Sequence, residues 1–228
     1  GNDLDDNLTT GYDFSIGLNT SFTGEDSLDV AIQAGHADAA GIGEFDGDTT
    51  TNEALVVDEI SYTFPLGDNI TVMVGDNKDA SALFTTSCVY GGPTDTLDAC
   101  GNVNAAVDNG GVMAGLSYDF GNGLTAAVGY AGNEDDVANE EGRDAYGFNV
   151  AYTGDNYGVS FTMGALEDNA AAPQDNMGTD YAYAVNAYFT PEGNLPSISV
   201  GYEYGEDDSA ASTADEYTNV FAGLKWDE

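Results

Sequence analysis

The residue types that most often perform catalysis are few in this chain and poorly placed for it. The single histidine, His36, has no neighbouring nucleophile, so no Ser/His/Asp set is indicated. Adjacent acids such as Glu134 and Asp135 could act as general acid and base only in a desolvated cleft, and in a loop we expect them to be solvated. No phosphate-binding loop or dinucleotide fingerprint is present. The sequence therefore predicts that the protein is not an enzyme.

Two short acidic motifs carry the oxygen ligands that Ca²⁺ prefers. Asp46 and Asp48 form one motif, and Asp76 and Asp79 form the other. Neither motif follows the EF-hand register with its closing glutamate. We therefore expect no cofactor and no specific metal site, with Asp46, Asp48, Asp76 and Asp79 as weak Ca²⁺ candidates. Diffuse binding of Ca²⁺ or Mg²⁺ to the acidic loops is expected instead.

The chain has two cysteines, Cys88 and Cys100, in a segment rich in Gly, Asp and Asn. A structural zinc site normally needs four ligands, and His36 is remote in the sequence. The pair therefore predicts a disulfide that closes a loop, and hence an oxidising compartment.

The charge balance is extreme and excludes some partners. The 228 residues include 41 acidic side chains against Lys78, Arg143 and Lys225, which gives a net charge of −38. Such a surface repels nucleic acid and anionic headgroups, so neither is an expected partner. Dissolved salt would screen the self-repulsion over less than about 10 Å.

The residues described above must be positioned by β-strands, which are indicated by the alternation of apolar and polar residues along the sequence. Between positions 12 and 35, large apolar residues occupy every second position on either side of a turn at 23–26. This pattern is typical of an antiparallel hairpin, and its arms have the roughly ten residues of a membrane-crossing strand. No apolar run approaches the roughly 18 to 20 residues of a membrane helix.

The same pattern recurs along the chain and predicts eleven strands. In the third, we expect Val56 and Ile60 to share one apolar face with Tyr62 and Phe64. The predicted strands lie within 12–22, 28–34, 56–64, 70–74, 112–120, 124–130, 146–152, 157–163, 181–189, 198–204 and 220–226.

The predicted connections alternate strictly between short and long. The short ones are turns, at 23–26, 65–69, 121–123, 153–156 and 190–195. The long ones hold most of the acidic runs, at 38–53, 77–110, 133–143, 166–179 and 205–216. Short turns at one rim, long loops at the other and aromatic residues near strand ends are typical of outer-membrane barrels. We therefore predict an all-β fold, an antiparallel up-and-down transmembrane β-barrel, with residues 1–228 as one partial barrel domain.

The second face of the predicted strands is small and polar, and in a barrel it would face a watery lumen. Acidic side chains there would attract cations, so a cation-preferring diffusive pore is expected. Alternatively, the Gly and Ala residues on this face would fit packing against a second layer in a soluble β-protein. The candidate pore-lining residues are Asp13, Asn19, Gln33, Glu59, Asn149, Asn186 and Glu203.

Four strings resemble the cyanobacterial outer-membrane porins related to the carbohydrate-selective (OprB-type) porins. They are NTSFTGEDSL at 19–28, SYTFPLGDN at 61–69, PSISVGY at 196–202 and VFAGLKWD at 220–227, and the similarity covers most of 11–228. The resemblance implies a barrel of roughly 16 strands. It also implies a preceding S-layer-homology domain and coiled coil, which this sequence lacks. Together with the odd strand number, it leads us to expect the middle part of a longer chain.

The resemblance also implies a function. Small hydrophilic solutes and inorganic cations would diffuse through a pore in the outer-membrane lipid, commonly as a homotrimer. The segment 77–110 would be the loop that narrows the lumen, with Asp95, Asp98 and Asp108 as candidate constriction residues beside the cysteines. The acidity and the shortage of arginine depart from the family pattern and count against sugar or anion selectivity.

A second class of function stays open at this point. An incomplete barrel has two open strand edges, which invite pairing with other copies. An acidic structural or adhesive cell-surface protein, assembled through such edges and through divalent cations, would have the same composition.

Overall fold

The computed structural model describes residues 12–35, 51, 53–90, 100–102, 104–107, 111–134, 137, 143–167, 179–206 and 216–226, with the side chains of Asp13 and Thr179 excepted. The described residues form one sheet of eleven strands. The strands are β1 (Asp13–Thr20), β2 (Ser27–Gly35), β3 (Val56–Pro65), β4 (Ile70–Asp76), β5 (Val112–Asp119), β6 (Leu124–Gly132), β7 (Asp144–Thr153), β8 (Tyr157–Glu167), β9 (Thr179–Phe189), β10 (Ser197–Glu206) and β11 (Glu216–Lys225).

Every strand pairs with its neighbours in the sequence and is antiparallel to them, in the order β1 to β11. The prediction of eleven antiparallel up-and-down strands is confirmed. Within the described part of the chain, β1 pairs only with β2 and β11 only with β10, so these two strands form the edges of the sheet. None of the described residues forms a helix that is long and apolar enough to span a membrane.

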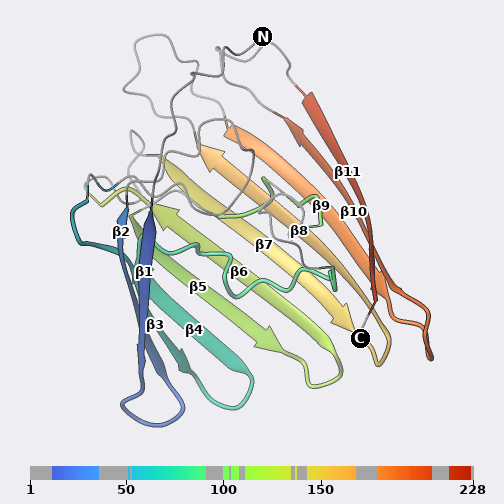
Figure 1. The fold of residues 1–228 in the computed structure, drawn as a ribbon, viewed down its shortest axis with the longest axis horizontal. Helices are drawn as coiled ribbons and strands as arrows, with labels where there is room; N and C mark the ends of the chain where they lie inside the picture. Colours follow the sequence, from blue (N-terminus) through green and yellow to red (C-terminus); the bar gives the residue numbers. More distant parts are fainter. Residues whose placement is uncertain are drawn as a thin grey trace.

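The strand ends that the short connections join lie at one rim of the sheet, and the strand ends on either side of the long connections lie at the opposite rim (Figure 1). We name the rim where the short connections join the strand ends the turn rim, and the opposite rim the loop rim. The tight turn between β5 and β6 needs glycine, because Gly123 has a φ of +85° and an added Cβ would collide with the carbonyl oxygen of Thr153. The predicted alternation of connection lengths therefore corresponds to two different rims.

A bulge interrupts the alternation in β3. The pairing of β2 with β3 shifts between Ala31 and Ile32, so that Asp58 is an extra residue and Ile32 lies opposite Val57. The expectation that Val56 shares a face with Ile60 was wrong, because the bulge reverses the facing of the residues before Asp58. Val57 takes the apolar position instead and is 63% exposed.

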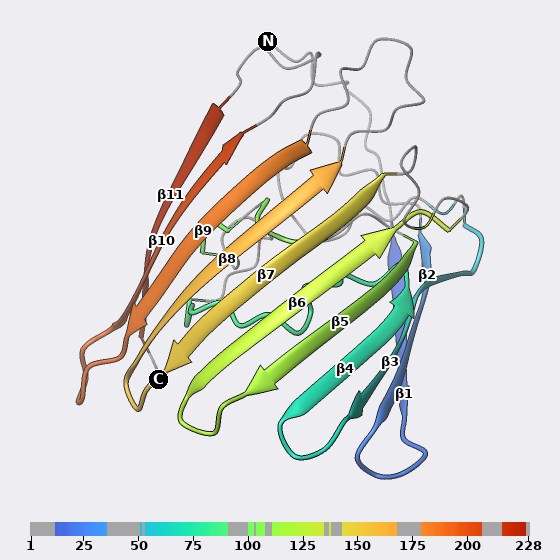
Figure 2. The same ribbon diagram turned by 180° about the vertical axis from the view of Figure 1, so that it is seen from behind.

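The sheet curls so that both of its edges turn toward the same side (Figures 1 and 2). Large apolar side chains on the convex outer face are exposed, as at Leu18, Val128 and Val200. On the concave inner face, polar side chains such as Asn149 and Ser160 are buried. This distribution is the reverse of that in a water-soluble sheet, whose apolar face is covered.

A stretch of the β4–β5 connection lies against the inner face (Figures 1 and 2). We name its described residues, 79–90, 100–102 and 104–107, the inner loop. The inner loop supplies Ala80, Leu83, Phe84 and Val107 to the largest apolar cluster of the structure. The sheet contributes the rest of this cluster, namely Met73, Met113, Ala131, Ala145 and Leu166. The core therefore lies between the loop and the sheet.

Candidate functional site

The inner loop divides the inner face into two parts. We name the inner-face residues of β5–β11 the covered half, and those of β1–β3, together with Lys78, which contacts Glu59 of β3, the open half. The boundary is β4, whose Met73 packs beneath the loop. The two halves use their polar side chains differently.

A row of glycines makes room for the loop in the covered half. Gly115, Gly129, Gly147 and Gly164 lie directly opposite one another on β5 to β8. A Cβ atom added to Gly129 would lie 2.5 Å from the carbonyl oxygen of Ala80, and one added to Gly164 would lie 2.6 Å from that of Ala106. Only residues without a side chain allow the backbone of the loop to approach the sheet so closely.

Neutral polar side chains of the covered half bind the loop backbone. The Oδ1 of Asn149 accepts a hydrogen bond from the N–H of Thr85 at 2.9 Å, and its Nδ2 donates to the Thr85 carbonyl at 3.2 Å. The hydroxyl of Ser160 accepts from the N–H of Ser87 at 2.8 Å. These bonds replace the water that unpaired loop amides would need.

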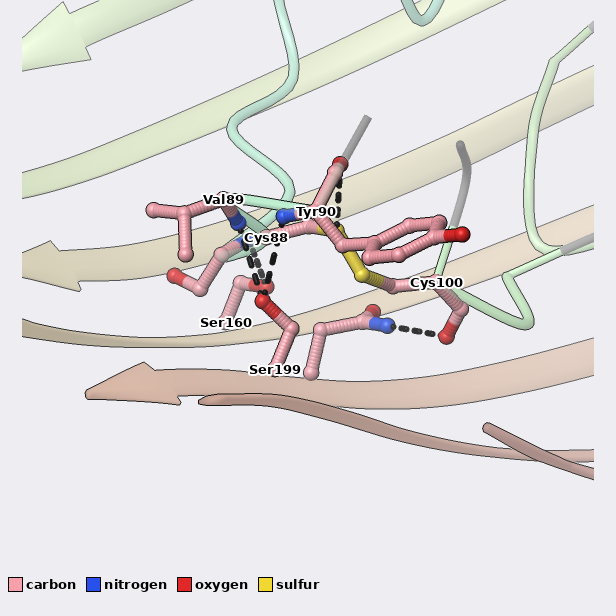
Figure 3. Close-up of a disulfide and its surroundings, with 8 residues drawn as sticks. Cys88, Val89, Tyr90, Cys100, Ser160 and Ser199 are labelled. Carbon is pink, nitrogen blue, oxygen red and sulfur yellow. Dashed lines mark hydrogen bonds between the residues drawn. A yellow bond between two sulfur atoms is a disulfide. The ribbon is translucent and has the colours of Figure 1, made fainter. Parts of the chain in front are cut away.

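The disulfide joins two described stretches of the inner loop, 79–90 and 100–102 (Figure 3). The predicted pairing of Cys88 with Cys100 is present, with Cα atoms 6.1 Å apart. The hydroxyl of Ser199 accepts hydrogen bonds from the N–H groups of Val89 and Tyr90 at 3.1 and 3.2 Å. The carbonyl of Cys100 accepts from the Nδ2 of Asn186 at 3.0 Å. The backbone that follows Cys88 and the carbonyl of Cys100 are thus both hydrogen-bonded to the sheet.

Glu203 is the one acidic side chain of the covered half that is fully buried among the described residues. Its Oε2 accepts from the N–H groups of Asn104 and Ala105 at 2.8 and 3.0 Å. Its Oε1 accepts from the side-chain amides of Asn104 and Asn219 at 3.1 and 2.9 Å. Four neutral donors therefore replace the hydration of this carboxylate. Three of them belong to Asn104 and Ala105, so Glu203 holds the stretch 104–107 of the inner loop, which we name the returning arm.

The open half has charged side chains in contact with solvent. The Nζ of Lys78 lies 2.6 Å from the Oε1 of Glu59, and the two side chains are 29% and 26% exposed. The Nδ2 of Asn19 donates to the hydroxyl of Ser27 at 2.6 Å and to a carboxylate oxygen of Asp29. In the described structure these side chains bind one another, and none of them binds the backbone of the inner loop.

The bulge in β3 adds a further carboxylate to the open half. The Nε2 of Gln33 donates to the Oδ1 of Asp58. Among the polar side chains of β1–β3 that face inward, Ser61 is buried at 4% exposure, whereas Ser27, Asp29 and Glu59 are partly exposed and Asn19 is exposed.

The turn between β1 and β2 is organised around Asp26. Its Oδ1 accepts hydrogen bonds from the hydroxyls of Ser21 and Thr23 and from the N–H groups of Phe22 and Thr23, at 2.6 to 3.0 Å. Its Oδ2 accepts from the hydroxyl of Tyr62 at 2.6 Å. The hydrogen bonds from Ser21 and Tyr62 hold the pKa of the Asp26 carboxyl well below its usual range.

A cavity of about 290 Å³ lies beside the inner loop near the loop rim. Asn104 and Ala106 of the loop line one side of it, and Leu166, Asp180 and Tyr217 of the sheet line another. The loop therefore leaves part of the covered half open at this rim.

The predicted inner-face residues are split between the two halves. Asn149, Asn186 and Glu203 are at most 1% exposed and contact the inner loop, not open space. Asn19, Gln33 and Glu59 lie in the open half, and Asp13 belongs to β1 but its side chain is outside the described residues. The constriction candidates Asp95, Asp98 and Asp108 and the metal candidates Asp46 and Asp48 are also outside the described residues.

The remaining metal candidates, Asp76 and Asp79, belong to no larger group of ligating side chains among the described residues. The Oδ1 of Asp79 accepts from the N–H and the hydroxyl of Ser81 at 2.7 and 2.6 Å. Asp76 lies opposite Ile60 in the pairing of β3 with β4. Across the described ranges, no group of three or more His, Cys, Asp or Glu side chains is placed to hold a metal ion.

The glycine row was not predicted as a docking surface. The available signal was the richness of the second strand face in Gly and Ala, for which packing against a second layer was one interpretation. That layer is the chain's own inner loop. Comparison of the sequence with protein-family models and with curated proteins finds no match. The resemblance to cyanobacterial porins therefore stays a prediction.

Proposed function

We propose that the protein is an outer-membrane porin that lets small hydrophilic solutes and ions diffuse passively, with a preference for cations. The single observation that carries this proposal is the reversed polarity of the sheet. Its exposed outer face is apolar, with Leu18, Val74, Val128 and Val200 between 42% and 53% exposed. Its inner face carries the polar side chains, such as Asn149, Ser160 and Glu59, beside the apolar cluster under the inner loop. An apolar exterior of this extent needs lipid around it, and a polar interior suits a water-filled lumen.

The rims support the same proposal. Aromatic rings pair near the turn rim, with centroids 5.5 Å apart for Tyr62 and Phe64 and 4.7 Å for Tyr118 and Phe120. Near the loop rim, the rings of Tyr181 and Tyr183 stack at 6.4 Å. Aromatic belts at both ends of an apolar band are typical of barrels at the two membrane interfaces.

The distribution of charge supports cation preference. The five long connections between strands contain nineteen of the 41 acidic residues and only two basic ones, Lys78 and Arg143. The five short connections contain five acidic residues. A mouth with this excess of carboxylates raises the local cation concentration and repels anions. The inner loop across the concave face is a candidate constriction, as the resemblance implied for 77–110.

The test is conductance across a planar lipid bilayer with a KCl gradient. We expect stepwise insertion of channels and a reversal potential of the sign that K⁺ selectivity gives. A reversal potential that indicates Cl⁻ selectivity would contradict the proposed charge selectivity. Membranes that carry no current, at protein amounts that insert into liposomes, would overturn the porin function itself.

A second candidate is favoured by one observation, the edges of the sheet at β1 and β11. Each of these strands pairs on one side only in the described structure, and such edges invite pairing with other copies. The protein would then be an acidic structural or adhesive surface protein. A chelator should dissociate an assembly held by divalent cations. A barrel should instead fractionate with the outer membrane and resist SDS until it is boiled.

A further inference from the structure

We infer that ions in the proposed pore pass along the open half of the inner face, and that the Glu59–Lys78 pair sets how strongly cations are preferred there. This inference rests on the proposed function, because it concerns the path and the selectivity of the same pore. It differs from the expectation that every inward polar residue lines the lumen, since it assigns transport to only one part of the face.

The covered half offers ions few free groups. Asn149, Ser199 and Glu203 are at most 1% exposed, and their polar atoms bind the backbone of the inner loop. An ion there would have to displace the loop and leave several buried amides without acceptors, which is costly. Where the inner loop lies on it, the covered half is therefore a wall and not a path, and only the cavity at the loop rim stays open.

The open half offers carboxylates in contact with water. Asp29 lies opposite Ser61, and Glu59 lies opposite Ala31, so the two acids are diagonal neighbours on β2 and β3. Diagonal side chains on one face lie about 7–8 Å apart, close enough for a passing ion to interact with both. Asp58 extends this acidic track toward the loop rim through the bulge and its contact with Gln33.

Lys78 is the basic residue placed on this track. Its ammonium binds Glu59 at 2.6 Å and is also close enough to Asp29 to attract that carboxylate. The chain's other basic residues, Arg143 and Lys225, lie just before β7 and at the end of β11. Asp29, Asp58, Glu59 and Lys78 together have a formal charge of −2. Because Lys78 and Glu59 are partly exposed, substitutions at these two positions can change this charge without disturbing the core.

The experiment measures reversal potentials in planar bilayers for the unmodified chain and for variants of this pair. Lys78→Gln should raise the K⁺/Cl⁻ permeability ratio, and Glu59→Gln should lower it. Each change should be about twofold, as expected for one charge at several Å in a wet, screened path. The double variant Lys78→Gln/Glu59→Gln restores the charge of −2 and should return close to the unmodified ratio.

Two matched controls change the same charges elsewhere. Lys225→Gln removes a positive charge at the end of β11, and Glu192→Gln removes a negative one from the β9–β10 turn. Both should leave the permeability ratio within the scatter of repeated measurements. If the unmodified protein conducts but these controls shift the ratio as much as the Lys78 and Glu59 variants do, the assigned path is wrong and the porin function stands. If the unmodified protein does not conduct, both proposals fail.

A second measurement does not depend on selectivity. Ala31 is partly exposed on the open half, and Ala184 is 1% exposed on the covered half. A positively charged methanethiosulfonate reagent should reduce the current of the Ala31→Cys variant and leave that of Ala184→Cys unchanged. Equal block of both variants, or block of Ala184→Cys alone, would overturn the path along the open half.

Discussion

The covered and open halves of the inner face belong to the same sheet and have the same alternation, yet they differ in what their polar groups contact. In the covered half, Asn149 and Glu203 are buried by the backbone of a distant segment. In the open half, Glu59 and Lys78 face solvent. Alternation therefore determines which face of the sheet a side chain takes. Whether that side chain is then buried depends on whether a distant segment of the chain, here the inner loop, packs against it.

The difference between the halves begins with the smallest residues. Glycines and alanines of β5–β8 leave a shallow depression into which the inner loop fits. The inner face of the open half instead carries charged and amide side chains, at Asn19, Asp29, Gln33 and Glu59. A loop that folds inward therefore needs both a place to lie and hydrogen-bond partners for its backbone, and only one half supplies the two together.

Replacing Cys88 and Cys100 by serine should have the largest effect on stability. The disulfide closes a loop with a sequence separation of 12, and loss of a crosslink of this size costs about 3 kcal/mol of unfolding free energy in the chain-entropy description. The measurement is the urea midpoint of the protein refolded in detergent micelles, with a reducing agent added to both proteins. The reducing agent should lower the midpoint of the unmodified protein and leave the double variant unchanged. An equal response would show that the disulfide contributes nothing.

Adding a side chain to Gly201 should disturb the covered half almost as much. A Cβ at this position would overlap the carbonyl oxygen of Cys100, so the loop backbone would have to move. Gly201→Val should therefore cost about 2–3 kcal/mol, within the range of overpacked cores. Gly17 of β1 is the matched control, because an added Cβ there has no heavy atom within 4 Å. Equal loss of stability in Gly17→Val and Gly201→Val would contradict the distinction between the two halves.

Removing the acceptor at Glu203 should release the returning arm of the loop. In Glu203→Gln, an amide N–H₂ replaces one oxygen and faces two donors, which leaves buried groups unsatisfied and costs about 1–3 kcal/mol. If the proposed pore exists, its single-channel conductance should rise, because the loop would occupy less of the proposed lumen. Glu59→Gln is the matched control in the open half, with an expected stability change below about 1 kcal/mol. If the conductance of Glu203→Gln stayed constant, the buried carboxylate of Glu203 would not be what holds the inner loop in its position.

The strands were predictable because their pattern is local. A period of two is visible within each segment, and all eleven strands lie where the apolar residues alternate. The bulge at Asp58 was missed, since one extra residue leaves no mark in the composition. The contacts of the inner loop were also missed, because Glu203 and Asn104 are 99 positions apart and only the fold brings them together. The disulfide was predictable, because the chain contains only two cysteines.

The smallest effect is expected at Asp26, which connects the β1–β2 turn to β3 by hydrogen bonds. Its carboxylate joins the β1–β2 turn to Tyr62 of β3. Because its pKa is lowered in the folded state, the stabilisation is fully present above the usual carboxyl pKa of about 4. Below that pH, the unfolded chain binds a proton that the folded chain does not, so the stabilisation declines as the pH falls.

Asp26→Asn should therefore be less stable than the unmodified protein at neutral pH, and the difference should shrink as the pH falls from about 4 toward 2. The measurement is the urea midpoint of both proteins across this range. Glu25→Gln removes a charge from the same turn and should show a difference that is small and nearly independent of pH. If the Asp26→Asn difference stayed constant down to about pH 2, or grew, the hydrogen bonds to an ionised Asp26 would not be what holds the open half at the turn rim.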